Sequence, residues 1–451
     1  MLKPFDLSVK KRVGCFNKTI MVDSDKSISI RSFLLGAISE KVSSVKNVLE
    51  SEDVASTIAC LKKLGVKIKK VNFNNYIIFG NGLGSLKAKK NSKLNFGNSG
   101  TLARLLIGIL STTPGLELKV HGDHSLNKRS MKKLVNLMSE FGASFVPKEK
   151  IKFPLKLISS NYPVGINYKA GVSAQLKSAV ILAGLNSNGV TKVIENEKSR
   201  DHTENMILSN LKIIKISKKK NKKKIITING KKKLNPLDII VPGDPSSASF
   251  FVALTLLNRN SSLVIKNVGL NKTRTGFYEI LKKQKANLKF KNIRKINNEP
   301  RGDIIVKSCK IKPIKAGNSF YVSSTDEYPI LFSIAALTKG KSTFKGIQDL
   351  ANKESNRITE MQKILRQIGV KSKYSKNVLN IYGKGMINGS NKKIFVSNLG
   401  DHRICMSSFI LAALTGASLK IKNFETVYTS SPSFLKIAKL LGIKFEIKKK
   451  S

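Results

Sequence analysis

The chain has 451 residues, 41% hydrophobic and 24% charged, so it is long enough for more than one domain and too apolar to be disordered as a whole. Its 82 basic and 28 acidic residues give a net charge of +54, which would attract polyanions such as nucleic acids. Lysine supplies most of this excess, whereas a surface selected to bind phosphates should also use arginine. We therefore attribute most of the charge to biased composition and expect no specific nucleic acid partner.

The cysteines and the N-terminal residues indicate the cellular compartment. Cys15, Cys60, Cys309 and Cys405 are far apart and show no metal-binding or redox spacing, so we expect reduced thiols in a cytoplasmic protein. Residues 1–12 contain no apolar signal segment, and no apolar run approaches the roughly 18 residues that span a membrane. We expect neither a targeting segment nor a membrane partner.

Internal repeats organise the chain. A polar start, an apolar stretch of helical length, a turn and a β-rich segment recur six times. The apolar stretches begin at Asp25, Asn98, Ser173, Asp244, Asp326 and Asp401. Each is apolar almost all round, which predicts a buried helix capped by its first residue. A strand-like run and a second, amphipathic helix follow in each copy, as in residues 51–68.

The repeating unit is therefore about βαβαββ, with helices inside and sheets outside. Six such units divide into two α/β domains of three, with a boundary near the turn at 241–247. The Lys-rich segment 215–233 alternates with β-branched residues and contains Asn229-Gly230, which predicts an exposed hairpin. A nucleic acid-binding arm is the alternative for this segment.

Groups that could hold anions collect at the helix starts, where backbone N–H groups and the helix dipole attract negative charge. The first helices of the repeats contribute Lys26, Ser27, Ser99, Thr101, Ser173, Gln175 and Arg403, and the second helices contribute Arg129, Arg200, Arg274, Lys353 and Arg357. Arginine binds carboxylates and phosphates bidentately, so this set favours a ligand with several negative charges. Simple capping or surface ion pairing is the alternative at each single position.

Two carboxylates accompany these cations. Asp326 is expected to open a buried helix, and Glu354 follows Lys353 directly. Paired carboxylates in a cationic pocket suit proton transfer at both ends of a reaction, although either could be a cap or an ion-pair partner. His121 and His124 have no further ligand set, so we expect no metal.

Nine motifs in order along nearly the whole chain give a more specific indication. They are DKSIS at 25–29, GNSGT at 97–101, GDHSLNKR at 122–129, SAQLKSAVILAGL at 173–185, SRDHTE at 199–204, VPGDPSS at 241–247, DEYPIL at 326–331, KESNR at 353–357 and DHRI at 401–404. Together they resemble the 5-enolpyruvylshikimate-3-phosphate (EPSP) synthases, in particular the class II type. The resemblance implies two inverse α/β barrel-like domains of three βαβαββ units each, with the active site in the cleft between them. One domain would comprise residues 20–243. The other would comprise residues 1–19, which contain the first strand, and residues 244–451.

The reaction that the resemblance implies belongs to the shikimate pathway, which leads to chorismate and aromatic amino acids. The enolpyruvyl group of phosphoenolpyruvate moves to the 5-hydroxyl of shikimate 3-phosphate, and phosphate is released without any cofactor. Shikimate 3-phosphate would bind to Lys26, Ser27, Arg31, Ser173, Ala174, Gln175, Arg200, Asp326 and Lys353. Phosphoenolpyruvate would bind to Lys26, Gly100, Arg129, Gln175, Arg357 and Arg403. The implied catalytic residues are Asp326 as base, Glu354 as acid, and Lys26, which would contact both substrates.

Several positions depart from the family pattern. They are Asp23 and Ser24 in place of Pro-Gly, Ile30 in place of His, Ser130 in place of Pro, and Asn356 in place of Asp. The lysine that many class I members carry near the C-terminal motif is absent at 429–432. Gly100 leaves room for glyphosate in the phosphoenolpyruvate site, so we expect the herbicide to inhibit.

Two other functions are compatible with parts of the sequence. A sister transferase acts on UDP-N-acetylglucosamine, but its usual Lys-Asn pair is here Lys26-Ser27. A polyanion-binding protein on a degenerate transferase scaffold would explain the net charge of +54, but not the retention of Asp326, Glu354 and Arg403. We therefore expect an enzyme, acting as a monomer on two small anionic substrates.

Overall fold

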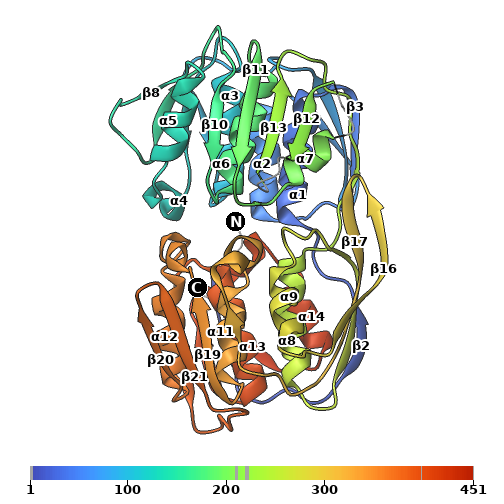
Figure 1. Ribbon diagram of the computed structural model, residues 1–451, viewed down its shortest axis with the longest axis vertical. Coiled ribbons are helices and arrows are strands. Elements are labelled where there is room, and N and C mark those ends of the chain that lie inside the picture. The colour runs from blue at the N-terminus through green and yellow to red at the C-terminus, as the bar shows by residue number, and fades with distance from the viewer. Residues whose placement is uncertain (1–3, 209–211, 219–222, 398, 450–451) are drawn as a thin grey trace. The chain divides into compact units, whose positions relative to one another are not determined.

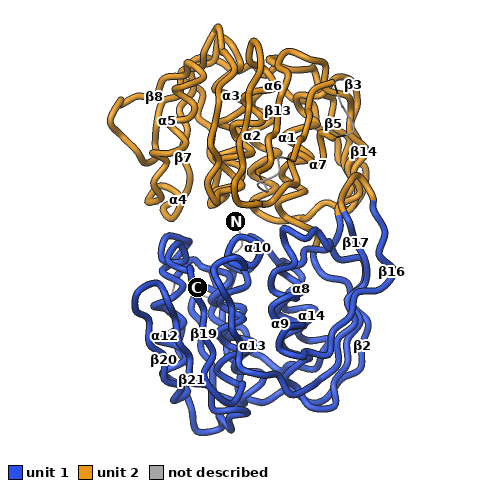
Figure 2. The backbone as a smooth tube through the Cα atoms, viewed as in Figure 1, with its two compact units in different colours: residues 1–23, 242–295, 300–451 blue, residues 24–241, 296–299 orange. Residues whose placement is uncertain are grey.

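A computed structural model describes residues 4–208, 212–218, 223–397 and 399–449. The chain forms two compact units (Figure 2). The C-terminal unit comprises residues 1–23, 242–295 and 300–451, and the N-terminal unit comprises residues 24–241 and 296–299. None of the helices in these described ranges is both long and apolar enough to cross a membrane.

The N-terminal unit contains three inner helices, α1, α3 and α6. Its helices are α1 (Lys26–Ile38), α2 (Glu52–Lys63), α3 (Gly100–Ser111), α4 (His124–Lys128), α5 (Lys132–Glu140), α6 (Ala174–Leu185) and α7 (His202–Ile207). Its strands are β3 (Glu40–Lys46), β4 (Lys67–Asn72), β5 (Asn75–Asn81), β6 (Ser92–Asn95), β7 (Glu117–His121), β8 (Ser144–Val146), β9 (Leu155–Ile158), β10 (Asn167–Ala170), β11 (Val190–Glu195), β12 (Ile214–Lys218), β13 (Lys224–Asn229) and β14 (Asp238–Ile240). Helix α3 packs against both α1 and α6.

The C-terminal unit repeats this arrangement around α8, α11 and α13, which pack against one another inside it (Figure 1). Its helices are α8 (Pro245–Leu257), α9 (Gly276–Lys283), η1 (Asn318–Phe320), α10 (Tyr321–Ser324), α11 (Tyr328–Ala336), η2 (Gln348–Asn352), α12 (Arg357–Gln367), α13 (His402–Thr415), η3 (Phe424–Thr429) and α14 (Phe434–Leu440). Its strands are β1 (Phe5–Val9), β2 (Asn17–Ile20), β15 (Ser262–Gly269), β16 (Leu288–Ile296), β17 (Glu299–Lys307), β18 (Lys315–Ala316), β19 (Gly340–Lys345), β20 (Lys371–Ser375), β21 (Val378–Gly383), β22 (Lys393–Val396), β23 (Ser418–Ile421) and β24 (Phe445–Lys449). Strand β1 pairs with β23 and β24 near the other end of the chain.

One sheet topology recurs throughout the described residues, where the strands form six four-stranded sheets. In the sheet β6-β7-β9-β8, β6 runs parallel to β7, whereas β9 is antiparallel to β7 and to β8. The inner helices are apolar, and every residue of α8 and α13 is buried. The predicted α/β fold of βαβαββ repeats, with buried helices and outer sheets, is confirmed.

The predicted helix starts are correct at four positions and wrong at two. The side chains of Asp25, Ser173, Asp244 and Asp401 accept backbone N–H bonds in the first turns of α1, α6, α8 and α13. At α3 the cap is Ser99, because the oxygen of Asn98 accepts a 2.5 Å hydrogen bond from Arg129 instead. Asp326 lies in the turn between α10 and α11, and α11 has Glu327 at its N-cap position. Asp326 is therefore not a cap.

The Lys-rich segment forms an antiparallel hairpin of β12 and β13, as predicted. The connection at 219–222 lies outside the described residues. Asn229 is the last residue of β13 and Gly230 follows it, so this pair does not lie between the two strands. A side chain at Gly230 would collide with the backbone carbonyl of Ser187, so a close backbone approach explains this glycine.

Candidate active site

In the N-terminal unit, Gln175 joins the starts of two inner helices. Its side-chain amide donates to Thr101 Oγ1 at 2.9 Å, and its carbonyl oxygen accepts from Arg104 Nη1 at 2.9 Å. These bonds hold the start of α6, with Ser173 and Ala174, beside the start of α3. The structure thus brings two of the predicted anion-binding helix starts together.

Arg31 extends this arrangement to α1. Its side chain is only 3% exposed, and its guanidinium donates to Thr203 Oγ1 at 2.9 Å, to Ser178 Oγ at 3.2 Å and to the Ser27 carbonyl at 3.0 Å. Ser178 lies on α6 and Thr203 on α7. Arg31 therefore links three helices, with two hydroxyl groups and one backbone carbonyl among its partners.

Arg129 ends α4 and comes close to Gly100 at the start of α3. Its Nη2 donates to Asn98 at 2.5 Å and to Ser125 at 3.3 Å. A Cβ at Gly100 would lie 2.7 Å from Arg104 Nη1 and 3.2 Å from Arg129 Nη1. Two guanidinium groups thus lie around a helix start that has no side chain, an arrangement suited to phosphate.

Lys26 has a partner that was not among the predicted site residues. Its ammonium lies 3.1 Å from the carboxylate of Asp53, a residue of α2 whose side chain is 7% exposed. Asp53 lies in the first turn of α2, the second helix of its repeat. Since the chain has only 28 acidic residues, an acidic residue at such a position was the sequence signal that could have identified it. Arg200, the remaining cation of this group, lies half-buried in the loop between β11 and α7.

In the C-terminal unit, Arg357 brings the two predicted catalytic carboxylates together. Its side chain is 1% exposed and lies 2.6 Å from Glu354, 2.9 Å from Asp401 and 3.7 Å from Asp326. Burial alone would lower the pKa of Arg357, but attraction to Asp401, Glu354 and Asp326 outweighs burial and raises it above its usual range. The site therefore combines one permanent cation with three carboxylates.

Arg403 differs from Arg357, because much of its guanidinium has no partner. The residue is 4% exposed, and its Nε and Nη1 have no hydrogen-bond partner within the described part of the chain. Its position is fixed at the start of α13, where its backbone N–H donates to Asp401. Because an unpaired buried donor is costly, these N–H groups indicate an anionic ligand.

Lys353 is held by Asp349, another residue that was not predicted. Its ammonium lies 2.6 Å from the Asp349 carboxylate, which also accepts a 2.8 Å hydrogen bond from the Tyr321 hydroxyl. Burial, and secondarily the charge of Asp349, raises the pKa of Tyr321 above its usual range, so this hydroxyl stays a donor. The spacing of four residues between Asp349 and Lys353 was the available sequence signal.

Two of the unusual positions have a structural explanation. Asn356 caps α12, because its side-chain oxygen accepts a 3.2 Å bond from the Thr359 N–H. The carboxylate of Asp23 accepts from the Ser431 hydroxyl at 2.7 Å and from the Ser433 N–H at 3.1 Å. Burial raises the pKa of Asp23, against these hydrogen bonds. Both substitutions thus keep their helix or loop in place.

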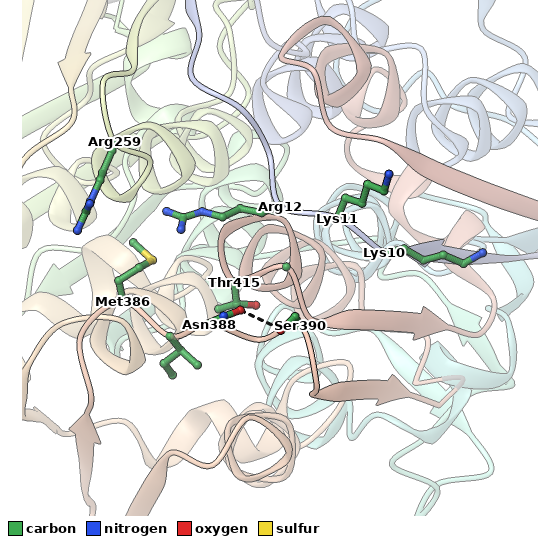
Figure 3. A pocket seen from close by; sticks show the side chains of 10 residues that line it. Lys10, Lys11, Arg12, Arg259, Met386, Asn388, Ser390 and Thr415 are labelled. Carbon is green, nitrogen blue, oxygen red and sulfur yellow. Dashed lines mark hydrogen bonds between the residues drawn. The ribbon is translucent and has the colours of Figure 1, made fainter.

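A separate cavity of about 570 Å³ in the C-terminal unit contains none of the predicted site residues. Its basic lining residues are Lys10, Lys11, Arg12 and Arg259. Figure 3 shows Lys10 and Lys11 extending away from Arg12, so the cations do not converge on one point. We assign no function to this cavity.

Comparison with known proteins places the chain in one family. The family model described as EPSP synthase (3-phosphoshikimate 1-carboxyvinyltransferase) matches residues 11–437. The 3-phosphoshikimate 1-carboxyvinyltransferase of Zymomonas mobilis is 37% identical, with 97% of each chain covered, and that of Bacillus subtilis is 37% identical over 94% of this chain and 97% of the relative. The EPSP synthase structure from Acinetobacter baumannii has a TM-score of 0.85 at 34% identity, covering 98% of this chain and 100% of that one. The enolpyruvyl transferase NikO from Streptomyces tendae, 13% identical with a TM-score of 0.74, shares the fold. The chain belongs to the EPSP synthase family.

Proposed function

We propose that this protein is a 3-phosphoshikimate 1-carboxyvinyltransferase, which transfers the enolpyruvyl group of phosphoenolpyruvate to the 5-hydroxyl of shikimate 3-phosphate and releases phosphate. The observation that carries the proposal is Arg403, a buried cation with unpartnered N–H groups, at the start of a helix whose cap, Asp401, also binds Arg357. Two substrates with two phosphates and two carboxylates require such fixed positive groups.

The donor roles follow from this chemistry. Arg357 and Arg403 hold the carboxylate of phosphoenolpyruvate, since paired guanidinium groups suit a planar anion. Its phosphate binds at Gly100 and Arg129, where a helix start and a guanidinium coincide. When the substrate carboxylate takes Arg357, the Arg357–Glu354 pair separates, so that Glu354 becomes available to carry a proton.

The acceptor roles fall mainly to the N-terminal unit. Ser173, the backbone of Ala174, and Arg200 bind the 3-phosphate, while Ser27 and Arg31 bind the ring substituents and carboxylate. Lys26 and Gln175 contact both substrates, and Lys353 lies near the reacting hydroxyl. The residues proposed for the acceptor are therefore drawn from both units.

Proton transfer proceeds through the two carboxylates. Asp326 removes the proton of the 5-hydroxyl while the oxygen attacks C2 of phosphoenolpyruvate, and Glu354 protonates C3. The tetrahedral intermediate then returns a C3 proton to Glu354 as the C2–O bond to phosphate breaks, which restores the enol ether. The departing phosphate takes the proton held by Asp326, so that both carboxylates regain their starting states.

The finer assignments rest on the sequence. We assign the chain to the class II type, because the lysine that many class I members carry near the C-terminal motif is absent at 429–432. Four free cysteines favour a reducing, cytoplasmic location. The protein acts as a monomer without a cofactor, since all proposed roles are filled by one chain.

The test is phosphate release by the purified protein with phosphoenolpyruvate and either of two acceptors. Release is expected with shikimate 3-phosphate and not with UDP-N-acetylglucosamine. Release with the nucleotide sugar, or from phosphoenolpyruvate alone, would contradict the proposal. No release with either acceptor, from a sample whose folding is verified by circular dichroism, would contradict it as well.

A further inference from the structure

A fully buried charge cluster lies one helical turn into α6, below the helix start that carries Ser173 and Gln175. The ammonium of Lys177 is 2.8 Å from Glu195 and 2.7 Å from Glu204, and the three side chains are between 0% and 1% exposed. Lys224, 15% exposed, lies 3.5 Å from Glu204 and 3.9 Å from Glu195. None of these residues has a role in the proposed reaction.

The two glutamates lie on either side of the loop that carries Arg200. Glu195 is the last residue of β11, and Glu204 lies in the first turn of α7. Lys177 therefore ties both ends of the loop 196–201 to α6. Glu195 Oε1 also reaches into the loop, where it accepts from the Ser199 N–H at 2.8 Å and from the Ser199 hydroxyl at 2.7 Å.

The same contacts lead to Arg31. Ser178 and Thr203 directly adjoin Lys177 and Glu204 in sequence, and the Thr203 hydroxyl donates to Ser178 at 2.8 Å. Arg31 donates to both of these hydroxyl groups. The cluster is thus connected to two of the cations that the proposed function assigns to shikimate 3-phosphate.

An ion cluster of this kind is an expensive way to stabilise a fold. Burying ions carries a large desolvation penalty, and apolar residues of similar volume often stabilise a fold equally well. Burial alone would lower the pKa of Lys177, but attraction to Glu204 and Glu195 raises it, so the lysine stays charged. What the cluster provides, and apolar packing would not, is directed hydrogen bonding to one backbone N–H and one hydroxyl of the loop.

We propose that Lys177 and Glu195 are positioning residues, which fix Ser199 and thereby hold Arg200 in place for the 3-phosphate of the acceptor. The inference rests on the proposed function and extends it to residues that do not contact substrate. Loss of the Ser199 contact should loosen the loop, so the acceptor phosphate would be bound less well, whereas the donor site and the proton-transfer groups would be unaffected.

Steady-state kinetics of three variants test this proposal. Ser199→Ala, which removes one hydrogen bond, should raise the KM for shikimate 3-phosphate about five- to tenfold, with kcat and the KM for phosphoenolpyruvate within about twofold of the unsubstituted protein. Glu195→Gln keeps an acceptor oxygen for Ser199 and should raise this KM less than Ser199→Ala. The matched control Val180→Ala, on the same buried helix, should lower stability and leave both KM values unchanged.

Equal changes in both KM values for Ser199→Ala, or an acceptor KM raised as much by Val180→Ala, would overturn the proposal. Hydrogen exchange of residues 196–201 provides a readout that does not depend on turnover. Exchange there should be faster in Ser199→Ala than in the unsubstituted protein, and unchanged in Val180→Ala. Equal exchange rates in the unsubstituted protein and in both of these variants would overturn the positioning role. If the unsubstituted protein released no phosphate, the proposed function would fail, and exchange would still decide the role of Ser199.

Discussion

Two buried arginines, Arg31 in the N-terminal unit and Arg357 in the C-terminal unit, have different partners. In the N-terminal unit, Arg31 donates to the hydroxyl groups of Thr203 and Ser178 and to a backbone carbonyl. In the C-terminal unit, Arg357 contacts the carboxylates of Asp326, Glu354 and Asp401. Arg31 therefore has hydroxyl and carbonyl groups among its partners, whereas Arg357 is surrounded by three carboxylates.

This difference separates binding from chemistry. A cation held by neutral groups keeps its full charge for a phosphate or carboxylate ligand, and it needs no rearrangement when the ligand arrives. A guanidinium held by carboxylates can exchange one of them for a substrate carboxylate, and the carboxylate that it releases can then act in proton transfer. We therefore expect substitution of the carboxylates around Arg357 to affect kcat most strongly, and substitution of cations that hold substrate, such as Arg31 and Arg403, to affect substrate KM values.

The largest expected effect is that of Asp326→Asn, which removes the proposed base. The amide does not accept a proton at neutral pH, so kcat should fall about 100- to 10,000-fold. Phosphate release at saturating substrates measures the change. Asp303→Asn, which removes a carboxylate paired with Lys266 in the same unit, is the matched control and should leave kcat unchanged. If Asp326→Asn kept more than a tenth of the original kcat, Asp326 would not be the base of the reaction.

A smaller effect is expected for Arg403→Lys. Lysine keeps the positive charge but loses the planar pair of donors, so the KM for phosphoenolpyruvate should rise about 10- to 100-fold, equivalent to about 1.4–2.7 kcal/mol. Arg366→Lys, at an exposed position of α12, provides the control and should leave that KM unchanged. If the KM for shikimate 3-phosphate rose instead, Arg403 would belong to the acceptor site.

Gly100→Ala should have a smaller effect again. The new methyl group would displace the guanidinium ends of Arg104 and Arg129, which are flexible, so the KM for phosphoenolpyruvate should rise only about threefold to tenfold. Glyphosate should inhibit the unsubstituted protein at millimolar concentration and inhibit this variant less. A rate of the unsubstituted protein that glyphosate leaves unchanged, with phosphoenolpyruvate near half-saturation, would show that Gly100 does not define this site.

The smallest expected effect concerns stability in acid. Burial opposes ionisation of Glu195, but Lys177 and Ser199 outweigh it and lower its pKa below the usual 4.5. The folded chain binds the proton of Glu195 less tightly than the unfolded chain does, so the ionised carboxylate stabilises the fold at pH values above 4.5. This stabilisation is lost as the pH falls below 4.5 and through the lower pKa that Glu195 has in the folded chain. In urea unfolding from about pH 7 to about pH 4, the advantage of the unsubstituted protein over Glu195→Gln should shrink. An advantage that is constant with pH would contradict this.

The fold was predictable because each repeat shows the same hydrophobic pattern in its own sequence. An apolar helix followed by alternating strands has few ways to be buried, and the repeats at Asp25 and Asp401 confirm the pattern with correct caps. The tertiary exceptions were not predictable. Asn98 lost its capping role to a contact with Arg129, and residues 296–299 belong to the N-terminal unit, where Glu299 binds His202 at 2.8 Å.

The candidate site shows the same limit. Motifs predicted the cations and carboxylates of the candidate site, although Arg129 ends α4 and Asp326 lies in the turn before α11. They did not identify Asp53 and Asp349, which hold Lys26 and Lys353, because an ion-pair partner is set by how helices pack and not by local sequence. The cluster around Lys177 was hidden for a related reason, since a lysine within an apolar helix gives no sign of the carboxylates that approach it from elsewhere.

The most direct test of the account is identification of the product. Phosphoenolpyruvate labelled with ¹³C at C2 is incubated with shikimate 3-phosphate and the protein, and the mixture is followed by NMR. We predict that the label moves into an enol ether at the 5-oxygen of the acceptor, in amounts equal to the phosphate released. Release of phosphate with labelled pyruvate and no enol ether would mean that the protein hydrolyses the donor, and would contradict transfer.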